Sequence, residues 1–382
     1  MIARVLVLGL VVMGLPAVGW SQSSQFGIRG LGLPGRHLSS RATGMGGSIA
    51  LFDPASVLAM APVTKLDGLT VGLETMQEWR ETTNPGGTGS IRNNRFPAFR
   101  IGGPIRRVRT WLSASASTYT NNDFGVATND TILIRGEPVP VVDTLVGLGG
   151  LNDLSLGAGY MINRRWAVGG AIHLITGSTR NRVRRVFQDS LGLYQSFRDS
   201  TEISFDGVGF SLSVLGDLSR TLSVALLLRS DGNANVTVDS TEAGEVDLPF
   251  TVSAGLMWSP SRLLTIGGHG TYQTWSAINS DLLQAGGLGA SNSYQVSAGA
   301  EWGWRGSPTA LPLRFGVRYG TLPFSLVPGS QPTEIAVSLG TGIRFARDKA
   351  SIDVAGEYIK RDQGDDWRET SFVLTAGVEV RP

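Results

Sequence analysis

From residue 67 to the C-terminus, the sequence alternates apolar and polar residues in short segments. In the segment 334–345, Ile335, Val337, Leu339, Ile343 and Phe345 occupy odd positions, while the even positions hold small and charged residues. The segments 248–258 and 372–380 repeat this arrangement. A period of two predicts β-strands with one apolar face, and the segments have about the length that a tilted membrane strand needs.

The two faces differ in a way that indicates which one meets lipid. The apolar face ends in Trp258, Trp302, Trp304 and Tyr319, and such a group is typical of the aromatic girdle at a membrane interface. The other face carries glycine, serine, threonine and charge, which would make a poor dry core. With 51 glycines and only 17% charged residues, the composition also favours a barrel over a soluble α/β protein.

Counting the segments predicts an all-β fold, a transmembrane antiparallel β-barrel of about 14 strands with an N-terminal hatch, or plug, segment. The expected strands are 67–79, 95–103, 109–120, 151–162, 165–187, 196–218, 220–231, 245–258, 262–275, 293–304, 311–321, 333–346, 349–361 and 367–380. Short connections are expected at 163–164, 217–220, 259–261 and 347–348, and long ones at 80–94, 121–150, 232–244, 276–292 and 322–332. This alternation is typical of short periplasmic turns and longer external loops, and it places both termini in the periplasm.

Residues 1–21 are expected to be a signal peptide. Arg4 precedes an apolar run at 5–15, and Ala17-Val18-Gly19 offers a cleavage site. The run is too short for a membrane-spanning helix. The chain has no cysteine, which excludes disulfides and thiolate metal sites. Its net charge of +2 does not indicate a nucleic-acid-binding surface.

The segment 41–62 is expected to organise the rest of the chain. We predict three regions: the signal peptide, a hatch at 22–66 that plugs the periplasmic mouth, and the barrel at 67–382. Asp53 as a cap and Pro54 at the first helical position predict a short helix after residue 53. The candidate hatch and ligand-contact residues are Gly44, Gly46, Gly47, Ile49, Leu51, Phe52, Asp53, Pro54, Leu58 and Met60.

This segment resembles the hatch of the outer-membrane hydrophobic-compound transporters typified by the long-chain fatty acid transporter, and that of the related PorV-type barrels. Gly44-Met45-Gly46-Gly47 and Asp53-Pro54-Ala55-Ser56 match their pattern, whereas Met60-Ala61-Pro62 stands where Asn-Pro-Ala would be expected. The resemblance implies localisation in the outer membrane and passive uptake of fatty acids or aromatic hydrocarbons through a hatch movement, without nucleotide or cofactor.

Charged residues on the polar face are expected to line the lumen. They are Arg229, Glu301, Arg314, Arg318, Arg344, Asp353, Glu357 and Glu379. Acid and base on neighbouring strands can pair, so a structural charge ladder is the favoured interpretation, and a polar passage or a contact for a ligand carboxylate is the alternative.

The strand 165–187 is longer than a bilayer needs and is predicted to project outside the membrane. There Arg180, Arg182 and Arg184 could bind lipopolysaccharide phosphates, or they could be an ordinary solvated charge run. On the next strand, the apolar face switches near Gly207, which suggests a β-bulge that could part the barrel wall.

Motifs for catalysis are missing from the sequence. Gly30-Leu31-Gly32-Leu33-Pro34-Gly35 matches a dinucleotide fingerprint, but no strand precedes it and Pro34 would obstruct the helix. His37, His173 and His269 lack metal-ligand spacing, and no GxSxG elbow occurs. We therefore expect no enzyme, no metal and no cofactor.

Three functions remain open. The first is a channel for passive uptake of hydrophobic small molecules, with outer-membrane lipid, lipopolysaccharide and the ligand as partners. The second is a PorV-like barrel that works with a secretion complex in protein secretion or surface attachment. The third is a general polar porin, suggested by the charged inner face.

Overall fold

The structure, a computed structural model, describes residues 24–382 except Arg106, 189–192, Ala285 and 304–310. The expected signal peptide and Trp304 lie outside the described residues. Among the described residues, no helix is both long enough and apolar enough to cross a membrane.

The chain forms a closed antiparallel barrel of 14 strands, as the alternation predicts. The strands are β2 (Thr70–Asn84), β3 (Gly87–Ile105), β4 (Thr110–Asn121), β6 (Glu137–Met161), β7 (Trp166–Phe187), β8 (Phe197–Asp217), β9 (Leu222–Ser230), β12 (Phe250–Trp258), β13 (Leu264–Gln273), β14 (Ser293–Trp302), β15 (Leu313–Thr321), β16 (Thr333–Phe345), β17 (Ala350–Gln363) and β18 (Trp367–Val380). Each strand pairs with the next along this series, and β18 pairs with β2 to close the ring.

The apolar face of these strands points outward, as predicted. Phe250, Val252, Ile335 and Leu339 are all exposed on the outer surface, and the side chain of Leu339 is 59% exposed. Inward positions carry buried polar groups such as Ser338. An exposed apolar belt round a closed barrel is the surface that lipid tails cover. The fold is therefore a transmembrane β-barrel.

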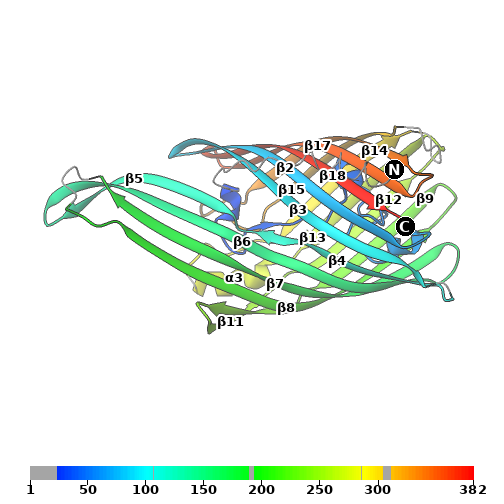
Figure 1. Cartoon of the computed structure of the whole chain (residues 1–382), viewed down its shortest axis with the longest axis horizontal. Coiled ribbons are helices and arrows are strands. Elements are labelled where there is room, and N and C mark those ends of the chain that lie inside the picture. The colour runs from blue at the N-terminus through cyan, green and yellow to red at the C-terminus, as the bar shows by residue number, and fades with distance from the viewer. Residues whose placement is uncertain (1–23, 106, 189–192, 285, 304–310) are drawn as a thin grey trace.

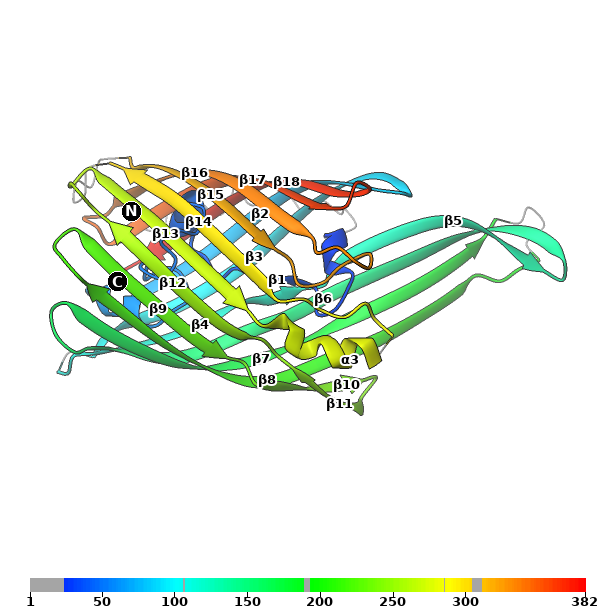
Figure 2. The ribbon, with the colours of Figure 1, turned by 180° about the vertical axis from the view of Figure 1, so that it is seen from behind.

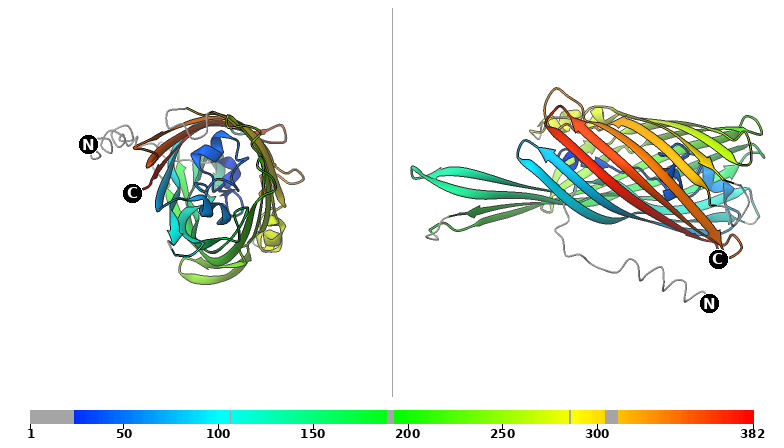
Figure 3. Two further views of the ribbon diagram at one scale, coloured as in Figure 1. Left: turned by 90° about the vertical axis from the view of Figure 1, so that its right-hand side faces the viewer. Right: turned by 90° about the horizontal axis from the view of Figure 1, so that it is seen from above.

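Residues 24–66 run through the lumen, where Figure 3 shows them in blue inside the ring of strands. Their elements are η1 (Gln25–Gly27), β1 (Leu33–Pro34), α2 (Ser40–Gly44) and η2 (Ala61–Lys65). We call residues 24–66 the lumenal segment. It is not confined to the end that carries the C-terminus: Ser24 hydrogen-bonds Glu369 beside the β17–β18 turn, at the opposite, or distal, end. The lumenal segment therefore extends along the lumen to the end opposite the C-terminus.

The helix expected after Asp53 is also absent, since the described backbone at 54–60 consists of turns and bends. The Asp53 carboxylate accepts hydrogen bonds from Ser39 Oγ at 2.6 Å and from the Ala55 nitrogen at 3.2 Å. The Val57 nitrogen donates to the His37 carbonyl. These contacts hold the stretch against residues 37–39, and tertiary packing overrides the helix propensity of so short a segment.

Several expected loops are strands. Residues 80–94 continue β2 and β3 up to a tight turn, and the loop 121–150 contains β5 (Phe124–Ile134), which pairs with the first part of β6. The loop 232–244 contains β10 (Asn233–Val238) and the start of β11 (Thr241–Asp247), whereas 276–292 holds part of η3 (Trp275–Ile278) and α3 (Asn279–Gln284). Strands beyond the bilayer meet water on both faces, so they show no apolar period to detect.

The long strands β6, β7 and β8 project from the barrel together with β5, as the length of β7 predicts (Figures 1 and 2). The predicted bulge at Gly207 is wrong, because β7 and β8 pair without a register shift through this residue. Phe205 points inward into a buried cluster, which explains the apparent switch of faces. The pairing of β8 is irregular on its other side, where it faces β9 and then β10. Phe210 pairs with Ser230 of β9, Gly207 pairs with Ala234 of β10, and Gly232 between them has a positive φ.

Candidate functional site

The glycine motif of the lumenal segment lies directly on the inner wall. A Cβ on Gly316 of β15 would lie 2.0 Å from the Gly46 nitrogen, and a Cβ on Gly44 would lie 3.0 Å from the Gly340 Cα of β16. Gly46 has a φ of +67°, and Gly47 one of +88°. The motif therefore allows backbone to pack on backbone, which explains glycine on both sides of the contact.

Past this motif, apolar side chains of the lumenal segment meet apolar patches on the wall. Ile49, Leu51 and Phe52 are buried in one cluster with Leu215 and Leu227, and Leu58 packs at its margin. Met60 belongs to a second cluster with Val63, Leu66 and Ala171. The candidate apolar residues of the segment are thus in contact with the wall, and Leu58 also lines an open cavity.

Two arginines of the lumenal segment are paired with carboxylates of the wall. Arg41 donates to Glu301 at 2.8 and 3.0 Å, and Arg314 donates to the same carboxylate at 2.7 Å. Arg314 also reaches Asp353 at 2.6 Å. The segment is therefore tied to β14 through a carboxylate that two cations share.

Arg36 makes the second tie. It lies 3.1 Å from Glu357, which also accepts from Arg318 at 2.8 Å. From Arg318 the network continues across the inner wall; its further members are Glu334, Arg361, Glu369, Arg80 and Glu78. These pairs join arginines and carboxylates on neighbouring strands. Arg344, by contrast, is exposed at the end of β16, and Glu379 pairs with Arg100 at 2.9 Å.

Arg229 belongs to a separate polar cluster that includes the arrangement Asp153–His173–Ser211. The Nδ1 atom of His173 lies 2.9 Å from Asp153 Oδ1, and its Nε2 atom lies 2.8 Å from Ser211 Oγ. Arg229 donates to the same Asp153 at 2.7 Å and to Asp231 at 2.6 Å. The connectivity is that of a serine-hydrolase triad, but the side chain of Ser211 is buried, at 5% exposure. A triad needs room for an acyl group at the serine, so the cluster is better explained as wall structure.

His37 extends this cluster from the lumenal segment. Its Nδ1 atom lies 2.8 Å from Ser117 Oγ of β4. The pKa of His37 is lowered to about 4, mainly because the ring is buried; Asp153 acts to raise this pKa and Arg229 to lower it. The imidazole is therefore neutral near pH 7 and contributes a hydrogen bond rather than a charge.

An apolar cluster lies at the distal end of the lumen. Trp275 and Ile278 from η3 contact a group whose other buried members are Leu31, Tyr119, Leu151, Ile175, Phe205, Ala234, Val246, Leu248 and Phe324. The rings of Trp275 and Phe324 meet edge to face, with centroids 5.4 Å apart. We call this group the distal cluster. Sequence reasoning missed it; the signal was Ile278 and Phe324, two large apolar residues within predicted external loops.

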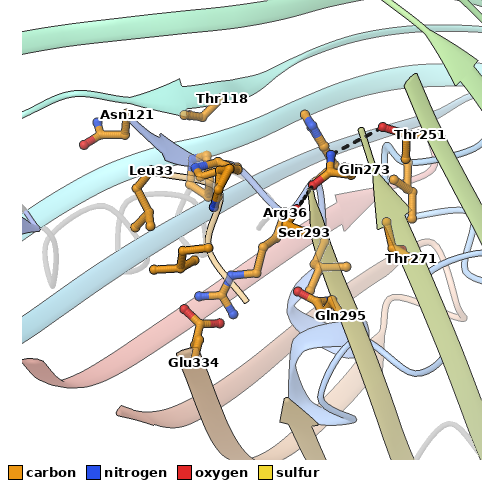
Figure 4. Close-up of a pocket in the computed structure, with 18 of the residues that line it drawn as sticks. Leu33, Arg36, Thr118, Asn121, Thr251, Thr271, Gln273, Ser293, Gln295 and Glu334 are labelled. Carbon is orange, nitrogen blue, oxygen red and sulfur yellow. Dashed lines mark hydrogen bonds between the residues drawn. The ribbon is translucent and has the colours of Figure 1, made fainter. Parts of the chain in front are cut away.

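A cavity of about 200 Å³ lies in the distal half of the lumen (Figure 4). Its apolar lining includes Leu33, Pro34, Leu38, Leu58, Leu322 and Pro323, and its uncharged polar lining includes Thr251, His269, Thr271, Gln273, Ser293 and Gln295. A second depression, lined by Asn121, Gly150 and Gly177 among others, lies where the β4–β6 register shifts beside Tyr119. Only the first cavity combines an enclosing apolar lining with hydrogen-bonding groups, as ligand sites do.

The three arginines predicted to bind lipopolysaccharide lie on the projecting part of β7. Arg180 is paired with Glu202 at 2.5 Å. Arg182 and Arg184 are exposed. The positions are compatible with contact to an anionic surface, but Arg180 already has a carboxylate partner.

Solved structures of similar fold include a hydrocarbon channel and a toluene transporter. The protein is similar to a Pseudomonas aeruginosa FadL homologue, with a TM-score of 0.62 and 11% identity over 91% of this chain and 99% of that one. It is also similar to the CymD monoaromatic hydrocarbon channel, with a TM-score of 0.54 and 14% identity over 97% and 99% of the two chains. For the Pseudomonas putida toluene transporter TodX, the TM-score is 0.54 and the identity is 12% over 91% and 98%.

These likenesses concern the fold, since the identities are low. No protein-family model matches the sequence, and no curated protein matches it either.

Proposed function

We propose that the protein is an outer-membrane channel for the passive uptake of hydrophobic small molecules, such as aromatic hydrocarbons or long-chain fatty acids. The observation that carries this proposal is the order of features along the lumen: an apolar cluster at the distal end, a partly apolar cavity next to it, and a lumenal segment filling the barrel beyond. The likeness in fold to a monoaromatic hydrocarbon channel and a toluene transporter supports the same class of cargo.

In this proposal the distal end faces outward, and residues 22–66 of the mature chain act as a hatch. An apolar molecule leaves water at the distal cluster, since burying apolar surface is favourable, and moves into the cavity beside Leu58. The lumenal segment blocks the remaining path, so the segment must shift for the molecule to pass. The ties at Arg36 and Arg41 are the contacts that such a shift would have to break.

A passive channel needs neither nucleotide nor cofactor, so we propose no enzymatic step. A polar porin fits less well, because the lumen is occupied and the charges of its wall are largely paired with one another. The PorV-like role with a secretion complex remains a hypothesis from the sequence resemblance.

The experiment is uptake of radiolabelled toluene and oleate by cells that carry or lack the gene. We expect faster uptake of at least one compound with the gene, and restoration of uptake by a plasmid copy. Equal uptake of both compounds by the two strains would contradict the proposal. Copurification with secretion proteins, together with unchanged uptake, would favour the second function.

We also propose that Arg182 and Arg184 contact lipopolysaccharide phosphates on the outer leaflet. Arginine recognises phosphate through paired hydrogen bonds, and these two side chains are exposed above the barrel. Arg182→Ser and Arg184→Ser should each weaken binding of the purified barrel to lipopolysaccharide, while Arg135→Ser, an exposed arginine between β5 and β6, serves as the single-charge control. Equal effects of the three changes would indicate a nonspecific charge contribution.

A further inference from the structure

His269 has a ring nitrogen without a partner in the wall of the cavity. The residue lies on β13, points inward and is 7% exposed. Its Nε2 atom lies 3.2 Å from Thr271 Oγ1, whereas its buried Nδ1 atom has no hydrogen-bond partner among the described residues. A buried polar atom of this kind is costly to leave unsatisfied, so it points to a group that is bound there in use.

The neighbouring polar side chains already have partners. Thr271 pairs with Ser253 at 2.9 Å, and Gln273 accepts from the indole nitrogen of Trp275 at 3.2 Å. Gln273 also donates weakly to Thr251, at 3.4 Å. Gln295 also lines the cavity but is only half-buried, so His269 is the buried uncharged side chain among the described lining residues that has an unpaired polar atom.

The charged groups at the cavity are also engaged. Its four arginines each face a carboxylate, the pairs being Arg36–Glu357 at 3.1 Å, Arg80–Glu78 at 2.5 Å, Arg95–Asp123 at 3.7 Å and Arg361–Glu334 at 2.7 Å. A charged ligand would lose its hydration and find its counter-charges already paired. An uncharged ligand avoids this cost.

We propose that the cavity selects uncharged molecules that join an apolar body to a hydroxyl group, of the phenol class, with the hydroxyl held at Nδ1 of His269. The apolar body would lie against Leu58, Leu322 and Pro323, which also line the cavity. Figure 4 shows Thr251, Thr271 and Gln273 on strands other than the one that carries Glu334, with Arg36 lying between them beside Ser293. This inference rests on the proposed function and narrows its cargo from hydrocarbons to molecules that carry a hydrogen-bonding group.

The test compares p-cresol with p-xylene, which have nearly the same shape and exchange a hydroxyl for a methyl group, and uses benzoate as the anion. Titration calorimetry with the full-length barrel in micelles, corrected with protein-free micelles, measures the affinities. We expect p-cresol to bind about tenfold more tightly than p-xylene, the worth of one hydrogen bond, and benzoate to bind more weakly than p-cresol. Equal affinities, tighter binding of benzoate, or no binding of p-cresol would overturn the proposal.

A separate experiment tests whether the ligand hydroxyl lies at His269. The chain has three histidines, so ¹⁵N-histidine labelling gives few ring signals, and p-cresol should shift the signal that disappears in His269→Gln. His269→Leu should abolish the preference for p-cresol, and His269→Gln, which can still hydrogen-bond, should keep most of it. Heat-modifiable migration on gels reports whether each variant folds. If neither variant folds, the wild-type affinities for p-cresol, p-xylene and benzoate still decide the selectivity.

Transport separates this inference from the proposed function. If p-xylene and p-cresol enter vesicles with the protein equally fast, and faster than they enter protein-free vesicles, the channel function is supported and the selectivity for p-cresol is contradicted. If both compounds enter vesicles with the protein no faster than protein-free vesicles, the proposed channel function is contradicted too.

Discussion

Gly46 of the lumenal segment packs so closely on Gly316 of the inner wall that a Cβ at position 316 would lie 2.0 Å from the Gly46 nitrogen. The next nearest atoms are the carbonyl carbon and oxygen of Met45, so no flexible side chain can give way. The glycine motif is thus explained by packing against the wall.

Gly316→Ala should therefore loosen the lumenal segment. Overpacking of a backbone contact typically costs about 1–3 kcal/mol, so we expect a lower urea midpoint and faster proteolysis within residues 24–66. Gly268→Ala on β13 is the matched control, because the nearest atom to its Cβ lies 4.0 Å away. The same loss of stability in both variants would show that the Gly46–Gly316 contact is not special.

Glu301→Gln should destabilise the barrel more than Arg41→Ala. Removing the carboxylate leaves Arg41 without its carboxylate partner and Arg314 with Asp353 alone, at a cost of about 3 kcal/mol, whereas removing Arg41 leaves Glu301 paired with Arg314. We expect a cost of about 1 kcal/mol for Arg41→Ala. Chemical unfolding of the two variants and the double variant measures both costs and their coupling. A larger effect from Arg41→Ala would contradict this account of the shared carboxylate.

His37 should make stability depend on pH. Its pKa in the folded protein, about 4, lies below the ordinary value of 6.5, so the unfolded chain binds more protons between these values. This contribution is fully present above pH 6.5 and is lost as the pH falls toward 4. The stability of wild type relative to His37→Gln should therefore drop between pH 7 and pH 4.5 in urea unfolding. A difference that stays constant over this range would mean that His37 is not buried as the structure has it.

The outer belt predicts a further asymmetry between exposed leucines. Leu339 lies midway along β16 and is 59% exposed, whereas Leu283 in α3 is 53% exposed at the distal end. Leu339→Arg should cost about 2–4 kcal/mol if lipid tails surround it, and Leu283→Arg should cost little. Folding into lipid vesicles, followed by the heat-modifiable band, compares the two. Equal folding yields would argue against a bilayer at Leu339.

The sequence predicted the barrel well because each strand that crosses a bilayer must expose an apolar face, and that face leaves a period of two. It predicted β5, β10 and β11 poorly, because these strands lie outside the belt and carry no such period. Phe205 was misread for a related reason: the distal cluster gives it an apolar environment inside the barrel, so its hydrophobicity did not indicate lipid.

The candidate site was predicted only in part. The inward charges could be read from strand periodicity, but the Arg41–Glu301 tie joins residues 260 positions apart and depends on how the lumenal segment docks. The unpartnered nitrogen of His269 depends on the rotamers of several strands at once. Neither the Arg41–Glu301 ion pair nor the unpaired nitrogen of His269 can be predicted from a sequence pattern.

The most direct test of a hatch that gates passage is a removable link between the lumenal segment and the wall. The Ser40 nitrogen donates to Glu74 Oε2 at 3.0 Å, and the chain has no native cysteine, so Ser40→Cys with Glu74→Cys provides the only thiols for a cleavable bis-maleimide. Toluene entry into vesicles is measured before and after reduction, with each single-cysteine variant as the control. We predict entry at the protein-free rate while the link holds and recovery once it is cleaved. Entry at the same rate in both states would contradict the proposal that the segment must move.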